Sequence, residues 1–226
     1  MSTAGVIAAQ TEKAYRKVIN SWAMYDWANS AFVTTIMAAV LPVYYSKVAG
    51  ATLSGNLATV YWGYTSTIAL LITALLAPIL GAIADYTGAK KRFLMAFAGL
   101  GVFFTALLYF VRTGDWLMAS AFYIVSNIGF AGSDMFYNSL LPHVARPEDI
   151  DQVSTRGYAF GYLGGGLLLA VNIAMIQLMP DAEFATRLAF VSVSIWWAVF
   201  TIPLIRNVPE PPASKGGLGQ INPVTA

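Results

Sequence analysis

Residues 81–93 read GAIADYTGAKKRF and join two long apolar runs, Leu57–Ala84 and Phe93–Val111. Each run holds the roughly 20 mostly apolar residues that a membrane-spanning helix needs. Both runs are far longer than the ~10-residue alternating segments of a membrane strand. The glycine and the basic cluster between them are typical of a short polar turn, so this part of the chain predicts two transmembrane helices joined by a loop.

The same pattern recurs along the rest of the chain. Hydrophobic residues make up 58% of the 226 residues and charged residues only 11%, whereas a soluble domain averages about a quarter charged residues. Four further apolar runs are separated by polar breaks: Trp22–Tyr45, Trp116–Leu141, Tyr158–Met179 and Phe184–Ile205. The sequence therefore predicts an all-α integral membrane protein with six transmembrane helices.

The predicted organisation has three parts. Residues 1–20 form a polar N-terminal segment, residues 21–206 form the six-helix transmembrane bundle, and residues 207–226, rich in proline and glycine, form a flexible tail. If the N-terminus faces the cytoplasm, only Lys47, Arg112 and Arg187 of the 13 lysine and arginine residues fall on the outer side. The positive-inside rule therefore predicts that both termini are cytoplasmic.

The composition excludes several kinds of chemistry. The chain has no cysteine and a single histidine, His143, which rules out disulfides and cysteine-based metal sites and leaves little for any other metal centre. No phosphate-binding loop, nucleophile–base pair or cluster of metal ligands appears, so we expect no enzyme activity, no metal and no cofactor. The net charge of +2 is too small to indicate nucleic-acid binding.

Two of the predicted spans carry polar side chains along one face. In the first span Asp26, Asn29 and Ser30 fall at positions i, i+3 and i+4, which lie on one side of a helix. A carboxylate facing lipid costs about 2.5 kcal/mol or more, so such a face is expected to point into the bundle or toward a watery cavity. The fourth span has a second polar face, which consists of Tyr123, Asn127, Asp134 and Asn138.

These two faces suggest a pathway for a solute or a proton. We predict that Asp134 is a proton-coupling or substrate-amine site, with Asn127 and Asn138 as hydrogen-bonding neighbours. The face of Asp26 would form the opposite wall or an inner gate. The alternative is structural: either aspartate pairs with Arg156 and locks the helix ends near the cytoplasm.

Glycines on the fifth predicted span form a separate pattern. Gly157, Gly161 and Gly165 are spaced by four residues, so they form a smooth stripe on one helix face. Such a stripe predicts close packing against another helix. It is also similar to the glycine motif of antiporters in the major facilitator superfamily, although Tyr162 stands where that motif has proline.

The loop at residues 81–93 resembles the loop between the second and third helices of the major facilitator superfamily. The family pattern is Gly-x-x-x-Asp-(Arg/Lys)-x-Gly-(Arg/Lys)-(Arg/Lys), and this sequence departs from it at Tyr86 and Ala89. We expect the loop, together with Arg156, to act as a structural or gating element, with its first glycine allowing close helix approach and its second turning the chain. The matching residues are Gly81, Asp85, Gly88 and Lys90.

Further motifs narrow the resemblance. The stretches YDWANSAF, YNSLLP, GYAFGYLGGGLLL and VPEPP are similar to the branch that includes the fungal vacuolar amino-acid effluxer. The superfamily has twelve helices in two halves, each a three-plus-three inverted repeat, and its first and fourth helices line the central cavity. The resemblance therefore implies that this chain covers one half, either as a half-size protein that must pair or as a fragment of a longer one.

The resemblance also implies a function. We expect a secondary active transporter that moves a small polar solute, such as an amino acid, by proton-coupled efflux with alternating access in a bacterial inner membrane. The expected partners are the lipid bilayer, the solute and a second six-helix half, which is either a second copy in a homodimer or a separate chain. The alternative is a membrane subunit that does not transport and that packs against a larger complex through its glycine stripe.

Overall fold

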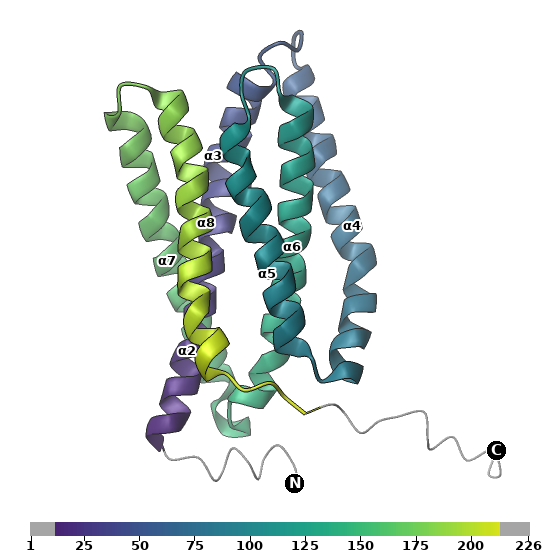
Figure 1. Ribbon diagram of the computed structural model, residues 1–226, viewed down its shortest axis with the longest axis vertical. Helices are drawn as coiled ribbons and strands as arrows, with labels where there is room; N and C mark the ends of the chain where they lie inside the picture. The colour runs from purple at the N-terminus through teal and green to yellow at the C-terminus, as the bar shows by residue number, and fades with distance from the viewer. Residues whose placement is uncertain (1–11, 213–226) are drawn as a thin grey trace, which may run out of the picture.

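The computed structural model describes residues 12–212, with the side chains of residues 84–87 left out of the description. Within this range every regular element is a helix (Figure 1). The first rod is continuous and contains α2 (Glu12–Ala31), the π-helix η1 (Phe32–Ala39), α3 (Val40–Tyr44) and the π-helix η2 (Tyr45–Ala49). The other long helices are α4 (Leu57–Thr87), α5 (Lys90–Leu107), α6 (Trp116–Val144), α7 (Ile150–Leu178) and α8 (Ala182–Asn207). Short 3-10 turns follow α5 and α6, η3 (Leu108–Phe110) and η4 (Pro147–Asp149).

The prediction of six long helices in an all-helical protein is confirmed for the described part of the chain. Five segments are long and apolar enough to cross a membrane: Glu12–Ala49, Leu57–Ile83, Lys90–Phe110, Pro147–Leu178 and Ala182–Asn207. The sixth helix, α6, is long enough but carries more polar side chains, among them Ser126, Asn127 and Ser133, all of which are buried. The first rod begins at Glu12, well before the predicted start at Trp22.

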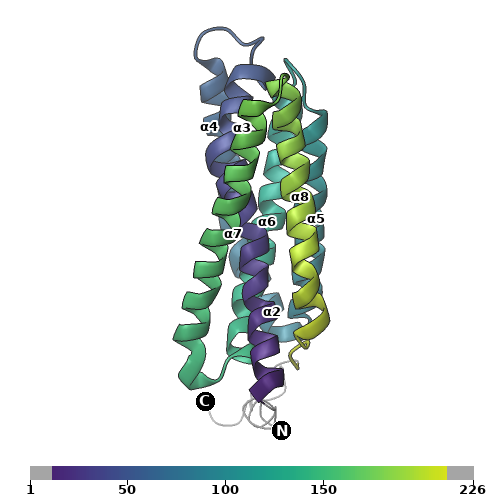
Figure 2. The same cartoon turned by 90° about the vertical axis from the view of Figure 1, so that its left-hand side faces the viewer.

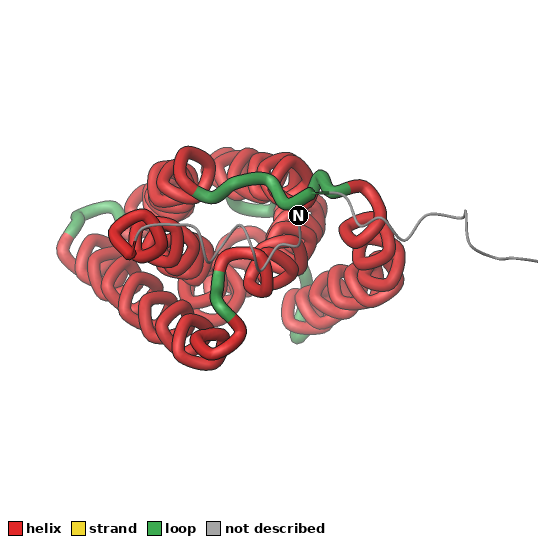
Figure 3. The backbone as a smooth tube through the Cα atoms, turned by 90° about the horizontal axis from the view of Figure 1, so that it is seen from below, coloured by secondary structure: helices red, strands yellow, loops and turns green. Residues whose placement is uncertain are grey.

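The helices form an elongated bundle in which α2 and α6 hold the central positions (Figures 1 and 2). Helix α2 packs against α7 and α8, and α6 packs against α4 and α5. Helices α5 and α8 pack against each other and so join the two groups. The backbones of α2 and α6 lie farther apart, with the large side chains of Trp22, Tyr25 and Tyr137 packed between them. The view along the bundle in Figure 3 shows the helices standing side by side. This arrangement leaves room where α2, α6 and α7 come together.

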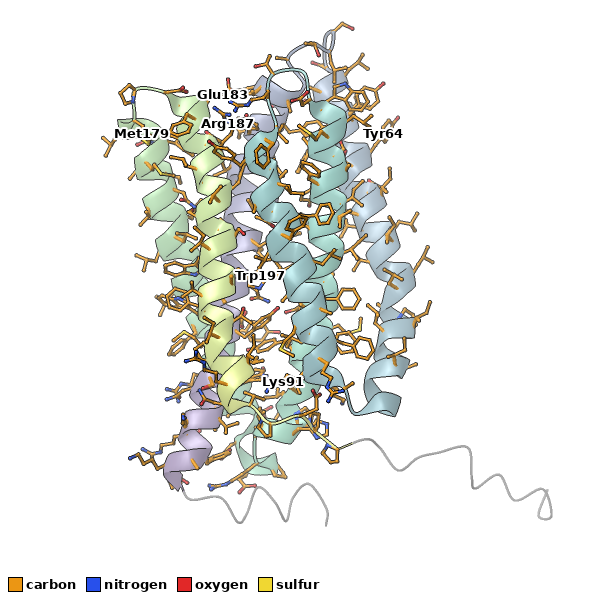
Figure 4. All side chains as sticks on the ribbon, in the orientation of Figure 1. Tyr64, Lys91, Met179, Glu183, Arg187 and Trp197 are labelled. Carbon is orange, nitrogen blue, oxygen red and sulfur yellow. The ribbon has the colours of Figure 1, made fainter. Side chains whose placement is uncertain are left out.

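Aromatic side chains fill the interior. Trp22 stacks on Tyr137 with ring centroids 4.3 Å apart, and its indole nitrogen donates to the Tyr137 carbonyl at 3.2 Å. Trp197, in the middle of the bundle in Figure 4, is fully buried and lies 5.7 Å from the ring of Phe32. Because lipid is as apolar as these rings, their close packing and hydrogen bonds stabilise the bundle more than their removal from water does.

Two of the basic residues used to predict the orientation, Lys91 and Arg187, lie at opposite ends of the bundle. Helix α2 begins and α8 ends at the same end, the lower one in Figure 1, as an even number of helices requires. Lys91 lies at this end, whereas the buried Arg187 and its neighbour Glu183 lie at the opposite end (Figure 4). The structure therefore agrees with the predicted separation of these two cations, while the side that faces the cytoplasm stays a prediction.

The segment after α8 is fixed against α5. The Lys91 amide donates to a carboxylate oxygen of Glu210 at 2.7 Å, and the Lys91 ammonium donates to the Val208 carbonyl at 2.7 Å. Ala89, which precedes α5, offers no capping side chain, so Glu210 supplies the acceptor and the negative charge that a helix N-terminus favours. The predicted flexible tail therefore does not begin at Asn207, which belongs to α8; residues 213–226 of that tail lie outside the described residues.

Candidate functional site

A pocket of about 230 Å³ lies where α2, η1, α6 and α7 meet. We call it the acidic pocket because two aspartates from different helices, Asp26 on α2 and Asp134 on α6, lie on its wall. The sequence predicted that these two polar faces would meet, and the structure brings them together. The other lining residues are Asn29, Ser30, Val33, Thr34, Phe130, Tyr158, Gly161 and Tyr162.

The α2 wall is polar and closely packed. The Ser30 hydroxyl donates to a carboxylate oxygen of Asp26 at 3.2 Å, which is the i,i+4 contact expected on one helix face. The side chain of Asn29 is almost fully buried, and its amide faces the Asp134 carboxylate on α6 just beyond ordinary hydrogen-bond distance. Asn29 therefore supplies an amide donor from the α2 wall to the carboxylate on the opposite wall.

The α6 wall is organised around Asp134. The side-chain amide of Asn138 donates to a carboxylate oxygen of Asp134 at 2.9 Å and to its backbone carbonyl at 3.0 Å. These two bonds hold the carboxylate in one orientation. Asn138 thus occupies the place predicted for it, as a hydrogen-bonding neighbour of Asp134.

Neither pocket aspartate forms an ion pair among the described residues. The ion pairs described there join Glu12 to Arg16 at 3.1 Å and to Arg146 at 3.2 Å. Arg156 instead lies 5.6 Å from the ring of Phe160 and lines a different cavity near the start of α2. The alternative prediction, an aspartate locked to Arg156, is therefore not found among the described residues, where the Arg156 guanidinium lies near the Phe160 ring instead.

Of the residues predicted for the α6 face, only Asp134 lines the acidic pocket; Asn138 contacts it through Asp134, and the other two lie elsewhere. Tyr123 is buried with its ring 4.8 Å from that of Trp62 on α4. Asn127 is also buried, and its amide donates to the sulfur of Met37 on η1 at 3.8 Å. In the part of α6 that precedes Asp134, α4 and η1 cover this face, so its side chains pack against these helices and do not line the pocket.

Tyr158 and Tyr162 on α7 belong to the pocket wall but were not predicted. Both are strongly exposed, at 61% and 80%, so they stand at the open rim. Their spacing of four residues, on either side of Gly161, places them on one helix face. From this spacing, the two tyrosines could have been predicted to lie beside Gly161 on the same face of the helix.

The predicted glycine stripe packs α7 directly onto α2. A methyl group at Gly157 would lie 2.9 Å from the Trp22 ring, and one at Gly161 would lie 2.6 Å from the Ser30 hydroxyl. At Gly165 the added carbon would lie 2.8 Å from the Ser30 carbonyl oxygen. These distances are shorter than ordinary contacts, so only glycine allows the two helices to stand this close.

The loop between α4 and α5 is only partly as predicted. Gly88 has a φ of +59°, a left-handed conformation that favours glycine, so it turns the chain as expected. Lys90 is nearly buried and its ammonium donates to the Ser139 carbonyl at 3.4 Å, which ties the loop to α6. Gly81, however, has no atom within 4 Å of the position of an added methyl group among the described residues, so the predicted close approach does not occur between the helices described here. The side chain of Asp85 lies outside the described residues.

Comparison with known proteins places the chain among membrane transporters. A family model described as "Vacuole effluxer Atg22 like" matches residues 58–221. The chain is 41% identical to the "Uncharacterized MFS-type transporter YxiO" of Bacillus subtilis over 204 residues, which cover 87% of this chain and 47% of that protein. It is 24% identical to "Autophagy-related protein 22" of Pyricularia oryzae over 219 residues, which cover 69% of this chain and 32% of that protein. No solved structure matches. The chain thus spans less than half the length of these relatives.

Proposed function

Because the chain belongs to the Atg22-like vacuole effluxer family, we propose that it forms one wall of a solute pathway through a membrane. Family membership confirms the resemblance that the loop motif indicated, and it agrees with the expectation that the protein is not an enzyme. The transported solute, the coupling ion and the direction of transport are parts of the proposal, since the chain matches only part of each relative.

The acidic pocket carries this proposal. Two carboxylates from different helices share one cavity, and no basic side chain neutralises either of them in the described structure. An intramembrane carboxylate is costly, so it is normally kept where a proton, an ion or a substrate uses it. A pocket that holds two carboxylates suits the ammonium group of a small solute, such as an amino acid.

We assign a separate role to each residue of the pocket. Asp134, held by Asn138, exchanges a proton or binds the ammonium group of the solute, while Asp26 and Ser30 form the facing wall. The amide of Asn29, which faces Asp134 from the α2 wall, helps to orient the Asp134 carboxylate. Proton movement through Asp134 would then drive efflux by alternating access.

The open side of the pocket needs a cover. Tyr158 and Tyr162 stand exposed at its rim, so a second six-helix unit is required to enclose a solute. We propose that this unit is either a second copy of the chain or a separate chain. The inverted repeat, the cytoplasmic termini and the location in a bacterial inner membrane belong to the same proposal.

The competing function is a subunit that does not transport, and the glycine stripe that suggested it is not available for contacts with other chains. That reading assigned the glycine stripe to contacts with a larger complex. In the structure Gly157, Gly161 and Gly165 already face α2 within the same chain. The stripe is therefore occupied and cannot serve as an outer docking surface.

Transport by the reconstituted protein tests the proposal. Purified protein, with any chain that co-purifies, is placed in proteoliposomes, and the flux of labelled amino acids is measured with and without a pH gradient. We expect gradient-dependent flux that Asp134→Asn abolishes. Asp151→Asn, a matched change at an exposed position on the first turn of α7, should leave the flux unchanged. Unchanged flux in the Asp134→Asn variant would remove Asp134 from the mechanism, and no flux in any preparation would favour the subunit.

A further inference from the structure

A second cavity, separate from the acidic pocket, lies between α2 and α8 at the end where α2 begins. Its volume is about 340 Å³, and its wall includes Lys13, Arg16 and Lys17. These three cations fall at i, i+3 and i+4 along α2, so they project from one face of the helix. None of the described residues that line the cavity is acidic.

Most of this positive charge is not neutralised by the protein. Arg16 forms an ion pair with Glu12, whose carboxylate lies 3.1 Å away. Lys13 and Lys17 have no carboxylate oxygen within 4.0 Å among the described residues. Two lysines that converge on one cavity repel each other unless an anion lies between them.

The rest of the wall suits a ligand that is part polar and part apolar. Asn20 offers a hydrogen-bond donor beside the cations, while Met24 and Pro203 supply an apolar surface one to two turns farther into the bundle. The side-chain amide of Asn207 on α8 donates to the hydroxyl of Ser21 on α2 at 3.0 Å, which holds the two walls together. The cavity therefore has a cationic mouth and an apolar inner end.

We propose that this cavity binds the phosphate headgroup of an anionic phospholipid, whose acyl chains start along Met24 and Pro203. Basic residues immediately outside a transmembrane segment attract anionic lipids, and basic pockets between transmembrane helices bind their headgroups. A soluble phosphate would use the cations but not the apolar end. The bound lipid neutralises Lys13 and Lys17 and joins α2 to α8 at the entrance of the bundle.

The proposal is tested by native mass spectrometry of the purified protein in detergent micelles, where the orientation of the protein in a membrane plays no part. The protein is titrated with phosphatidylglycerol, with phosphatidylcholine of the same acyl chains, and with soluble glycerol phosphate. We expect phosphatidylglycerol to bind best and glycerol phosphate to bind only weakly. Loss of each lysine should weaken phosphatidylglycerol binding about fivefold, so the Lys13→Ala/Lys17→Ala double variant should lose about 25-fold.

Matched variants separate this site from general attraction to charge. Lys47→Ala removes one lysine at the opposite end of the bundle and should leave the affinity unchanged, while Lys13→Arg/Lys17→Arg should retain binding. All three positions changed are on the surface of α2 or η2, and circular dichroism of each variant verifies its helix content. Equal binding of the two lipids, an unchanged affinity in the double alanine variant, or tight binding of glycerol phosphate alone would each overturn the proposal. Because none of these measurements uses transport, they are independent of the proposed function.

Discussion

Replacement of a single glycine tests whether the close contact between α2 and α7 holds the acidic pocket together. At Gly165 an added methyl carbon would lie 2.8 Å from the Ser30 carbonyl oxygen and 3.0 Å from its carbonyl carbon. Since 3.4 Å is the start of ordinary contact, the methyl group needs about 0.6 Å more room than the backbone provides. The obstacle is backbone, so no side chain can rotate away, and α7 must shift from α2.

The neighbouring Gly166 provides the matched control, because an added methyl group there meets no atom within 4 Å. Overpacking costs about 1–3 kcal/mol, whereas Gly→Ala in a helix gains about 0.5–1 kcal/mol. Gly165→Ala should therefore lose about 1–2 kcal/mol net, and Gly166→Ala should gain up to about 1 kcal/mol.

Thermal unfolding in detergent measures both changes. At about 2–4 °C per kcal/mol for a chain of this size, Gly165→Ala should lower Tm by about 2–8 °C, while Gly166→Ala should raise it by about 1–4 °C. The shift of α7 in the first variant should also break the bond from the Thr34 hydroxyl to the Gly165 carbonyl, now 3.0 Å long. Equal Tm values for the two variants would refute the contact between α2 and α7.

Two further changes test the contacts at the end where α2 begins. Glu210→Ala removes the acceptor for the Lys91 amide, so thermal unfolding should show a loss of about 1 kcal/mol, the usual effect of a lost helix cap; an unchanged Tm would contradict the capping role. Tyr15→Phe removes the hydroxyl that donates to Asp149 at 2.6 Å, and the loss should be about 1–3 kcal/mol because the carboxylate loses a partner. Tyr64→Phe at an exposed site should change Tm little, and an equal effect of the two tyrosine changes would contradict this contact.

The helical architecture could be predicted because membrane spans leave a strong pattern of length and apolarity. Periodicity also determined which residues share a face, so Asp26 and Asp134 could be assigned to inward faces before their neighbours were known. Periodicity does not determine which part of a face a neighbouring helix covers. Tyr123 and Asn127 share the face of Asp134, but contacts with α4 and η1 cover them.

Other features leave no local signal in the sequence. The π-helix over residues 32–39 replaces i→i+4 by i→i+5 hydrogen bonds, so a regular 3.6-residue count fails beyond Ala31. The contact between Lys91 and Glu210 joins residues 119 positions apart and depends on where α8 ends, which periodicity predicts only to within a few residues.

The central claim is that the acidic pocket is open to water, and the reactivity of an introduced thiol tests it most directly. These 226 residues contain no cysteine, so a cysteine introduced at position 33 or 199 adds one thiol to a cysteine-free sequence. Val33 lines the acidic pocket and is 37% exposed, whereas Val199 on α8 is 48% exposed and does not line it. Thiols react as thiolates, which form in water and not in lipid. A water-soluble thiol reagent applied to membranes should label Val33→Cys quickly and Val199→Cys slowly; equally slow labelling of both would contradict the claim.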